Sequence, residues 1–315
     1  TVLEGIEDYV GENVRVLYSE GCHLYRDRTS NVAMEHDRDS EVRAVCEASD
    51  VVIAVVGLDA TLEGEEGDTG NEYGSGDKPN LNLPGLQPDI IRIAKESGKP
   101  VIVVLLAGSA MALSWEDEHV DAILDGFYPG AQGGAAIAEI LFGGANPEGK
   151  LPITFYQTTE ELPEFTDYAM KGRTYRYMEN EALYPFGYGL SYTTYAYGNL
   201  ECVKPFDAQD GITLQVTVTN TGDREGTETL QVYVKAKREG TPNPQLKYVK
   251  KITLKPGESV TEEIHLSPEA FMLYDEKGNF TLEKGAYDIF VGGCQPDARS
   301  AALTGNAPQK LTVTY

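Results

Sequence analysis

The 315-residue sequence has no run of about eighteen apolar residues, the length that a helix needs to cross a bilayer. Basic residues are also scarce: 26 Lys and Arg stand against 50 Asp and Glu, and the formal net charge is -24. Nucleic acids and anionic membrane surfaces are bound by basic faces, so the composition argues against both as partners. The chain length predicts about two domains.

Cysteine and histidine are few, and none of them has the spacing of a metal site. No Cys-x-x-Cys pair occurs, and the cysteines and histidines are scattered singly: Cys22, Cys46, Cys202, Cys294, His23, His36, His119 and His265. This scatter disfavours a structural zinc site and a His-based catalytic dyad. No metal or cofactor is therefore predicted.

The first half of the sequence alternates short apolar runs with stretches of helix formers. Strands are predicted at 14–18, 51–58, 101–108 and 122–127, and helices at 40–48, 87–97 and 135–141. The first three of these runs are continuous and rich in Val and Ile, which is typical of strands buried on both faces of a sheet. Repeated strand, helix, strand units predict an α/β fold, a layered α/β/α sandwich with a mostly parallel sheet.

Near residue 195 the pattern changes to alternating apolar and polar residues. Strands of period two are predicted at 212–220, 228–236, 246–254, 259–266 and 285–293. Turn residues separate them, for example Asn220 with Gly222 and Pro256 with Gly257. About seven short strands over roughly a hundred residues predict an immunoglobulin-like β-sandwich, so the fold class is α/β followed by all-β.

Six acidic residues lie in a fifteen-residue loop directly after the apolar run at 51–56: Glu63, Glu65, Glu66, Asp68, Glu72 and Asp77. In an open parallel sheet, ligand sites form at the carboxyl ends of strands. Several carboxylates close together raise the pKa of at least one of them, and a protonated carboxyl group can donate a proton. The loop is therefore a candidate catalytic site, and the alternative is a solvated acidic loop or a weak calcium loop.

Four motifs in order resemble the C-terminal part of glycoside hydrolase family 3, the β-glucosidases and β-xylosidases. They are VVGLDATLEGEEGD at 55–68 with LNLPGLQ at 81–87, FYPGAQGGAAIAEILFGGANPEGKLPITF at 127–155, GRTYRY at 172–177 with YPFGYGLSYTTYAY at 184–197, and VTVTNTGDREGTETLQVYV at 216–234. The resemblance implies an α/β sandwich domain at 1–160, a linker at 161–195 and a fibronectin type III-like domain at 196–315. It covers nearly the whole chain.

The resemblance also implies that a part is missing. Members of the family usually begin with a (β/α)8 barrel that carries the nucleophilic Asp and much of the sugar pocket, and the α/β domain here is expected to lack its first strand. The chain is therefore expected to be an inactive fragment whose partners are the missing barrel and an oligosaccharide or aryl or alkyl β-glycoside substrate. A homo-oligomer is a further expectation. The acidic composition and the unpaired cysteines fit a bacterial cytoplasm, whereas the family also has secreted members.

The implied chemistry is retaining hydrolysis by two carboxyl groups, of which this chain would supply the acid/base. The matching positions are Glu63 and Glu65, with Glu63 the first choice. Glu66, Asp68 and Tyr128 are the candidate sugar-binding residues, and a solvated or packing role is the alternative for each. A carbohydrate-binding module and a structural module without catalysis are the alternative functions.

Overall fold

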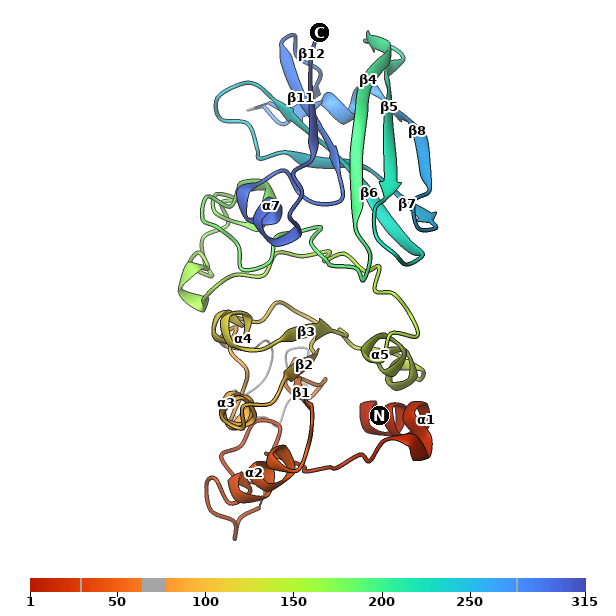
Figure 1. Cartoon of the computed structure of the whole chain (residues 1–315). Helices are drawn as coiled ribbons and strands as arrows, with labels where there is room; N and C mark the ends of the chain where they lie inside the picture. Colours follow the sequence, from red (N-terminus) through yellow and green to blue (C-terminus); the bar gives the residue numbers. More distant parts are fainter. Residues whose placement is uncertain (29, 64–77, 276) are drawn as a thin grey trace. The chain divides into compact units, whose positions relative to one another are not determined.

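The computed structural model describes residues 1–28, 30–63, 78–275 and 277–315 (Figure 1). The chain forms two compact units: the first comprises Thr1–Ala145 with Tyr156–Leu162, and the second comprises Asn146–Phe155 with Pro163–Tyr315. The predicted domain boundaries at residues 160 and 195 stay predictions. The described residues include no helix that is both long and apolar enough to cross a membrane.

The first unit is built on a parallel sheet with the order β1-β2-β3. Its strands are β1 (Val52–Gly57), β2 (Val101–Leu106) and β3 (Ala122–Asp125). Strands β1 and β2 pair from Val52 opposite Val101 to Gly57 opposite Leu106, so they end at the same level. Because β2 is almost fully buried along its length, its unbroken Val and Leu run suits a central strand of a covered sheet.

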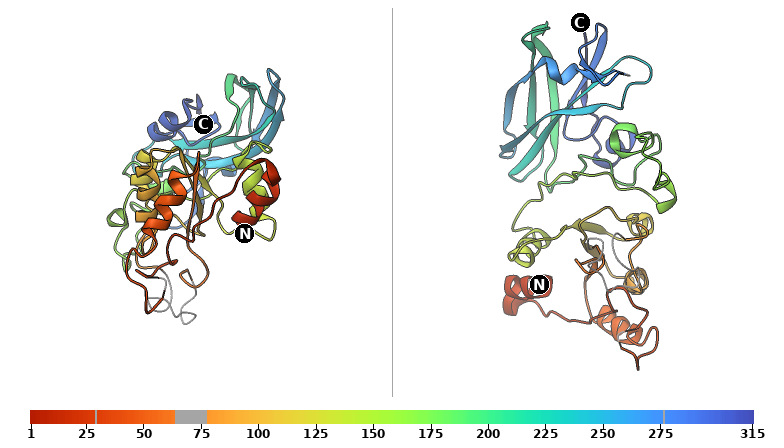
Figure 2. Two further views of the ribbon diagram at one scale, coloured as in Figure 1. Left: turned by 60° about the horizontal axis from the view of Figure 1, so that its bottom comes forward. Right: turned by 180° about the vertical axis from the view of Figure 1, so that it is seen from behind.

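Helices cover both faces of this sheet (Figures 1 and 2). One face packs on α1 (Val2–Val10) and α5 (Gly133–Leu141) through a core that includes Ile6, Val104 and Ile137. The other face packs on α2 (Asp39–Glu47) and α3 (Gln87–Glu96) through Val42, Ile93 and Val101. The short elements of this unit are η1 (Gly11–Asn13), α4 (Ser114–His119) and η2 (Thr159–Glu161). The predicted three-layer α/β architecture is confirmed.

The strand predicted at 14–18 is wrong. Residues 15–20 have no regular secondary structure, and Val14 and Tyr18 are 50% and 61% exposed. Only part of the run, around Val16, packs against the core beneath α1 and α5. A short apolar run becomes a strand only where a neighbouring strand accepts its backbone hydrogen bonds, and none pairs with it among residues 1–28 and 30–63.

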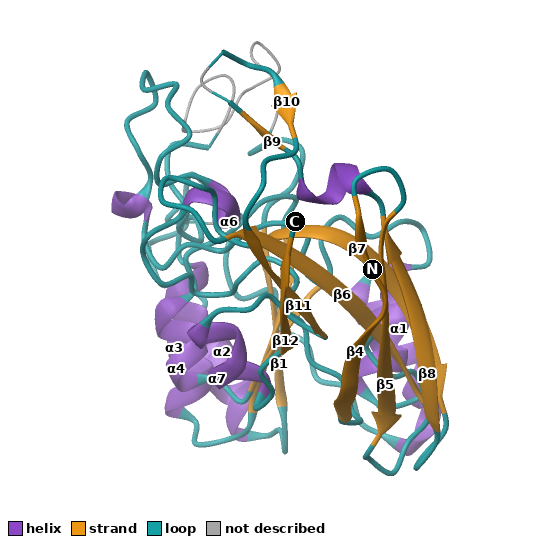
Figure 3. Ribbon diagram, turned by 90° about the horizontal axis from the view of Figure 1, so that it is seen from above, coloured by secondary structure: helices purple, strands orange, loops and turns teal. Residues whose placement is uncertain are grey.

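The second unit is a sandwich of antiparallel sheets, coloured orange in Figure 3. One sheet has the order β12-β11-β6-β7, with strands Gln309–Thr314, Ala286–Gly292, Gly226–Ala236 and Gln245–Leu254. The other has the order β4-β5-β8, with strands Tyr195–Asp207, Gly211–Asn220 and Ser259–Leu266. Inward residues of both sheets form one core that includes Leu214, Val232 and Ile289, each fully buried. The predicted β-sandwich is confirmed. Every second residue of β5 is buried in the core, as the alternating pattern predicts, whereas β6 is buried on both sides along most of its length.

Shorter elements complete the second unit. They are α6 (Thr174–Tyr177), η3 (Pro268–Phe271), the β9-β10 hairpin (Leu273–Tyr274 and Phe280–Thr281) and α7 (Ala298–Thr304). Strand β4, strand β12 and α7 were not predicted from the pattern. Helix α7 is held at its start by Asp297, whose carboxylate accepts hydrogen bonds from the Ser300 backbone N–H and hydroxyl at 2.8 and 2.6 Å. This is an ordinary N-terminal cap.

Candidate active site

The segment that follows β1 is anchored before it reaches Glu63. Asp59 accepts hydrogen bonds from the backbone and hydroxyl of Thr61 at 2.9 and 2.6 Å. The backbone N–H groups of Leu62 and Glu63 both donate to the Asp59 carbonyl, and the Leu62 side chain is fully buried. These contacts fix the turn and determine where the Glu63 carboxylate lies.

The start of this segment is clamped by a buried glutamine. Gln87, which is 3% exposed, accepts a hydrogen bond from the Gly57 N–H at 2.7 Å and donates to the Gly57 carbonyl at 2.8 Å and the Leu24 carbonyl at 2.6 Å. Gly57 has φ +138°, and a Cβ atom there would lie 2.0 Å from the Leu106 carbonyl oxygen. Only glycine fits this position.

The Glu63 carboxylate is held by donors that come from the ends of the next two strands. It accepts hydrogen bonds from the Gly108 N–H at 3.0 Å, the Ser109 hydroxyl and the Tyr128 hydroxyl. Lys78 Nζ lies 3.8 Å from Glu63 Oε1 and donates to the Ala110 carbonyl at 2.8 Å. Both side chains of this ion pair are largely buried, at 13% and 14% exposure. Three strand ends therefore meet at one carboxylate, because neighbouring parallel strands in the order β1-β2-β3 end at the same edge of the sheet.

These contacts keep Glu63 ionised. Burial by itself raises the pKa of Glu63, but the hydrogen bonds from Ser109, Tyr128 and Gly108 and the charge of Lys78 outweigh it and lower the pKa below its ordinary value. Burial, with the hydrogen bond to the Glu63 carboxylate next, raises the pKa of the Tyr128 phenol, so Tyr128 stays a proton donor in this bond. Burial also lowers the pKa of Lys78, and the attraction of Glu63 opposes that shift.

The sequence-predicted residues fall into two groups. Glu63 and Tyr128 lie together, and Tyr128 contacts Glu63 directly while 48% of the residue stays exposed. Glu65, Glu66 and Asp68 lie outside the described residues. The sequence analysis did not predict Ser109 and Lys78 as partners of Glu63. Only the position of Ser109, directly after the strand next to β1, could have indicated that it lies near Glu63. In the described residues, no group of three His, Cys, Asp or Glu side chains is placed to hold a metal ion.

Sequence reasoning also missed Asp125, the last residue of β3. Its Oδ1 accepts a hydrogen bond from the Phe127 N–H at 3.0 Å, whereas its buried Oδ2 has no partner among the residues that the structure describes. Burial raises the pKa of Asp125 to about 6, and the single backbone hydrogen bond only partly opposes this. A carboxyl group at the end of a strand thus prefers to stay protonated in weak acid.

Replacing Asp125 by Asn is expected to flatten the pH dependence of stability. Because the folded-state pKa lies above the unfolded value of about 3.9, the native state binds more protons between these values, and wild-type stability falls as pH rises from about 4 to about 6. The variant should lack this fall, which we place at about 2 kcal/mol after allowance for the partly exposed side chain. Urea unfolding at pH 4.5 and pH 7, followed by the fluorescence of Trp115, the single tryptophan, measures it.

The matched control for this measurement is Asp50→Asn, since Asp50 is an exposed aspartate of the same unit. Other carboxylates titrate in the same range, so the quantity compared is the difference between wild type and each variant. If the Asp125→Asn protein loses as much stability between the two pH values as the control, the raised pKa of Asp125 is contradicted.

Two family models match the chain. Residues 1–192 match the glycosyl hydrolase family 3 C-terminal domain, and residues 228–295 match a fibronectin type III-like domain. A periplasmic β-glucosidase of Salmonella typhimurium is 36% identical over 320 residues, which cover 93% of this chain and 41% of that protein. A xylan 1,4-β-xylosidase of Xylanibacter ruminicola is 40% identical over 280 residues, which cover 87% of this chain and 32% of that protein.

A solved structure is similar over the full length of the chain. A β-glucosidase from Erythrobacter marinus has a TM-score of 0.82 at 30% identity, and the match covers 100% of this chain and 43% of that one. The chain therefore spans 32% to 43% of the length of these relatives. The motifs, the fold and the family model agree, and the chain belongs to glycoside hydrolase family 3, with the family's C-terminal domain followed by a fibronectin type III-like domain.

Proposed function

We propose that this chain is the C-terminal portion of a retaining, exo-acting β-glycosidase of β-glucosidase or β-xylosidase type. The whole enzyme would remove terminal non-reducing sugars from an oligosaccharide or an aryl or alkyl β-glycoside. The names of the relatives and the share of their length that the chain covers support this proposal. The observation that carries it is the Glu63 carboxylate, which the donors Ser109 and Tyr128 hold at the carboxyl ends of the sheet.

In this proposal the chain supplies the acid/base and the barrel supplies the Asp nucleophile. Retaining hydrolysis needs two carboxyl groups about 5 to 5.5 Å apart, one of which attacks the anomeric carbon while the other protonates the leaving oxygen and then deprotonates water. The acid/base must therefore change protonation state twice in each cycle. The contacts of Glu63 suit the second step, in which a carboxylate takes a proton from water.

The first step requires a protonated group, and the missing barrel provides a physical route to it. A second carboxylate placed at this distance raises the pKa of its neighbour by like-charge repulsion. Docking of the barrel would thus raise the pKa of Glu63 from the low value that its hydrogen bonds impose. Once the nucleophile is consumed in the glycosyl-enzyme, that repulsion ends and the pKa falls again.

Glu65 stays the second candidate for the acid/base. Glu66, Asp68 and Tyr128 are proposed to contact sugar hydroxyls, which Tyr128 can do because the residue is 48% exposed while its hydroxyl contacts Glu63. Glucose and xylose differ by one hydroxymethyl group, and such a difference is worth only about 1 to 3 kcal/mol in a pocket. A homo-oligomer in which a second copy completes the pocket stays a prediction.

The test is hydrolysis by the full-length polypeptide of which this chain is the C-terminal part. We expect it to cleave an aryl β-glucoside or an aryl β-xyloside, and proton NMR of the first product should show the β-anomer, which is the retained configuration. The 315-residue chain alone should cleave neither. A full-length protein that binds sugar but cleaves neither glycoside would favour a binding module, and an inverted product would exclude the two-carboxylate mechanism proposed above.

A further inference from the structure

Tyr128 reaches the Glu63 carboxylate from a half-exposed position. Its hydroxyl donates a hydrogen bond to Glu63, although 48% of the residue is exposed. A tyrosine side chain at such a position can turn toward solvent, and holding it in one rotamer costs conformational entropy. The hydroxyl stays on the carboxylate only if the backbone on either side of Tyr128 and the surface beneath its ring hold the side chain in place.

The residue before Tyr128 has an unusual backbone conformation. Phe127 is left-handed, with φ +50°. This conformation is uncommon for a bulky residue, because its Cβ atom then crowds the neighbouring backbone. It persists only where the surrounding structure enforces it, and such positions gather at functional sites. The turn at Phe127 therefore requires contacts that hold it.

Asp125, the last residue of β3, supplies one of these contacts. Its Oδ1 accepts a hydrogen bond from the Phe127 N–H at 3.0 Å, which is the contact of an Asx turn. On the other side of Tyr128, Pro129 restricts the Tyr128 backbone to extended conformations, as proline does to the residue before it. The turn and the proline together leave the Tyr128 backbone little freedom.

Gly108 provides the surface against which the Tyr128 ring lies. A Cβ atom at position 108 would lie 2.6 Å from Cε2 and 3.0 Å from Cδ2 of Tyr128, and 3.2 Å from Glu63 Oε2. The Gly108 N–H donates to the same Glu63 oxygen at 3.0 Å. Gly108 does not have a left-handed backbone, so a side chain there would act by contact with the ring and not by backbone strain. Any side chain at this position would push the ring away from the carboxylate.

The other charged neighbour of Glu63 is held independently of Tyr128. The described residues place Lys78 and Tyr128 against the Glu63 carboxylate, and Asp59 acts on Tyr128. Lys78 Nζ also donates to the Ala110 carbonyl at 2.8 Å, which fixes it without help from the tyrosine. The contribution of Tyr128 to the site can therefore be changed while that of Lys78 stays the same.

We propose that Gly108 and the turn from Asp125 to Phe127 are positioning elements of the candidate active site, which fix the Tyr128 hydroxyl on the Glu63 carboxylate. Through this hydrogen bond they govern the protonation of Glu63 without touching a substrate. Their effect on hydrolysis rests on the function proposed above, whereas the placement of Tyr128 does not. The two can therefore be tested separately.

Carbon-13 NMR titration of the 315-residue chain, labelled in its glutamate carboxyl groups, measures the pKa of Glu63, and Glu63→Gln assigns the resonance. Two variants separate the backbone of Phe127 from its side chain. Phe127→Gly accepts a positive φ without strain, so it should keep the low pKa of Glu63 although it removes the whole ring. Phe127→Val, which tolerates this φ poorly, should raise the pKa of Glu63 as much as Tyr128→Phe does.

The other two positions have matched variants. Gly108→Ala should raise the pKa of Glu63 as Phe127→Val does, because the added methyl group displaces the Tyr128 ring. Asp125→Ala removes the acceptor for the Phe127 N–H and should have the same effect, whereas Asp125→Asn keeps that acceptor and should not. Because burial raises the pKa of Asp125 to about 6, this carboxyl is mostly protonated where Glu63 titrates, so the loss of its charge matters little.

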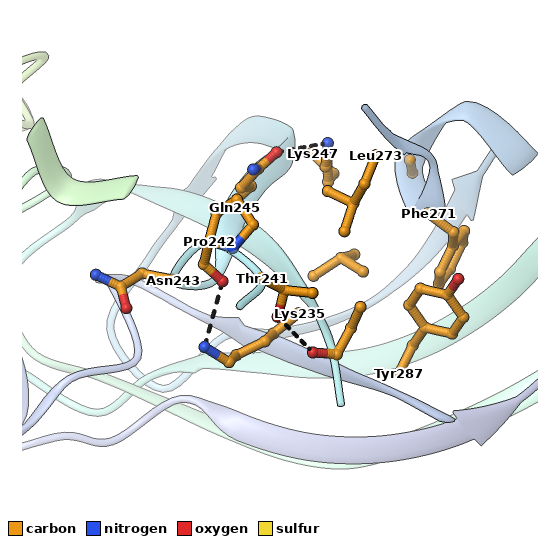
Figure 4. Close-up of a pocket in the computed structure, with 12 residues that line it drawn as sticks. Lys235, Thr241, Pro242, Asn243, Gln245, Lys247, Phe271, Leu273 and Tyr287 are labelled. Carbon is orange, nitrogen blue, oxygen red and sulfur yellow. Dashed lines mark hydrogen bonds between the residues drawn. The ribbon is translucent and has the colours of Figure 1, made fainter. Parts of the chain in front are cut away.

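A control comes from the second unit. Tyr287, labelled in Figure 4, donates its hydroxyl to the Glu283 carbonyl at 2.6 Å, and Tyr287→Phe should leave the pKa of Glu63 unchanged. A higher pKa of Glu63 in Phe127→Gly than in Phe127→Val would overturn the proposal, because the ring and not the turn would then hold Tyr128. A wild-type pKa in Gly108→Ala would overturn it as well.

If Phe127→Val does not fold, Gly108→Ala and the two Asp125 variants carry the test. In the full-length polypeptide, Gly108→Ala and Phe127→Val should move the same limb of the pH–rate profile as Tyr128→Phe, and Phe127→Gly should not. A full-length protein without hydrolytic activity would count against the proposed function alone, because the NMR titration of the 315-residue chain needs no catalysis.

Discussion

Replacing Glu63 by Ala in the full-length polypeptide is expected to lower kcat toward a glycoside with a poor leaving group by about 10²- to 10⁴-fold, the usual contribution of a general acid. For an aryl glycoside whose leaving group needs no proton, kcat/KM should fall much less, because glycosylation no longer needs the acid, whereas kcat should still fall, because hydrolysis of the glycosyl-enzyme lacks its base. Azide should restore turnover of the activated substrate, because the cavity left by the carboxylate admits a small anion that attacks the glycosyl-enzyme without base catalysis. The product would then be a glycosyl azide, which NMR identifies.

The same series distinguishes Glu63 from Glu65. If Glu65→Ala is rescued by azide and Glu63→Ala is slow with every substrate and not rescued, Glu65 is the acid/base. Glu63 would then be the residue that joins the β1 loop to Ser109 and Tyr128. Glu12→Ala, a change of an exposed glutamate in the same unit, is the matched control and should keep wild-type rates. Wild-type rates in both loop variants would mean that the proton comes from elsewhere.

Tyr128→Phe refines the assignment within the same series, because it removes one donor and leaves the Glu63 carboxylate in place. The hydrogen bond from Tyr128 lowers the pKa of Glu63, so its loss should raise that pKa and move the corresponding limb of the pH–rate profile to higher pH. Tyr18→Phe, at a 61% exposed tyrosine, should leave the profile unchanged.

Replacing Gln87 by Leu is expected to lower the free energy of unfolding of the first unit by about 3 to 5 kcal/mol. The amide pairs with both backbone groups of Gly57 and with the Leu24 carbonyl, and each buried group left unpaired costs about 1 to 3 kcal/mol. Leucine fills a similar volume, so the loss reports hydrogen bonding more than packing. Urea unfolding followed by Trp115 fluorescence measures it, since this tryptophan lies in the first unit.

The matched control is Gln132→Leu, because Gln132 is exposed and precedes α5. It should change stability by less than about 0.5 kcal/mol, as surface substitutions usually do. Gln87→Glu adds a second comparison, because it keeps the acceptor for the Gly57 N–H and loses the two donors. A Gln87→Leu protein as stable as the control would show that water or a rearranged loop satisfies the Gly57 and Leu24 groups.

The architecture follows from patterns that are local in the sequence. Unbroken Val and Ile runs at 51–58 and 101–108 predict buried strands, and they form β1 and β2. Strand β2 is almost fully buried, whereas β1 leaves Val55 46% exposed. Period-two alternation after residue 210 similarly predicts β5 to β8 and β11, because one side of each strand faces the core; the outer sides of β6 and β11 are also largely buried, which the alternation does not predict. The run at 14–18 had the same appearance but forms no strand, because strand formation depends on a partner that lies elsewhere in the chain.

The sequence predicted only some of the residues of the candidate active site. The loop's acidic composition and its place after a strand singled out Glu63, and these are properties of contiguous residues. Ser109 and Tyr128 lie 46 and 65 residues further along the chain, and Lys78 lies beyond the loop. No spacing rule relates these positions, so their meeting at one carboxylate is a consequence of the parallel order β1-β2-β3.

The sequence by itself therefore determined the two fold classes, the family and the loop that carries the carboxylates. The spacing of apolar residues and the order of the motifs can both be read from residues that are close together in the sequence. Only the tertiary structure decided that Glu63 is held ionised and that Asp125 resists ionisation. Protonation and hydrogen-bond satisfaction depend on burial and on distances of a few ångströms between residues far apart in the chain, and folding alone sets those distances.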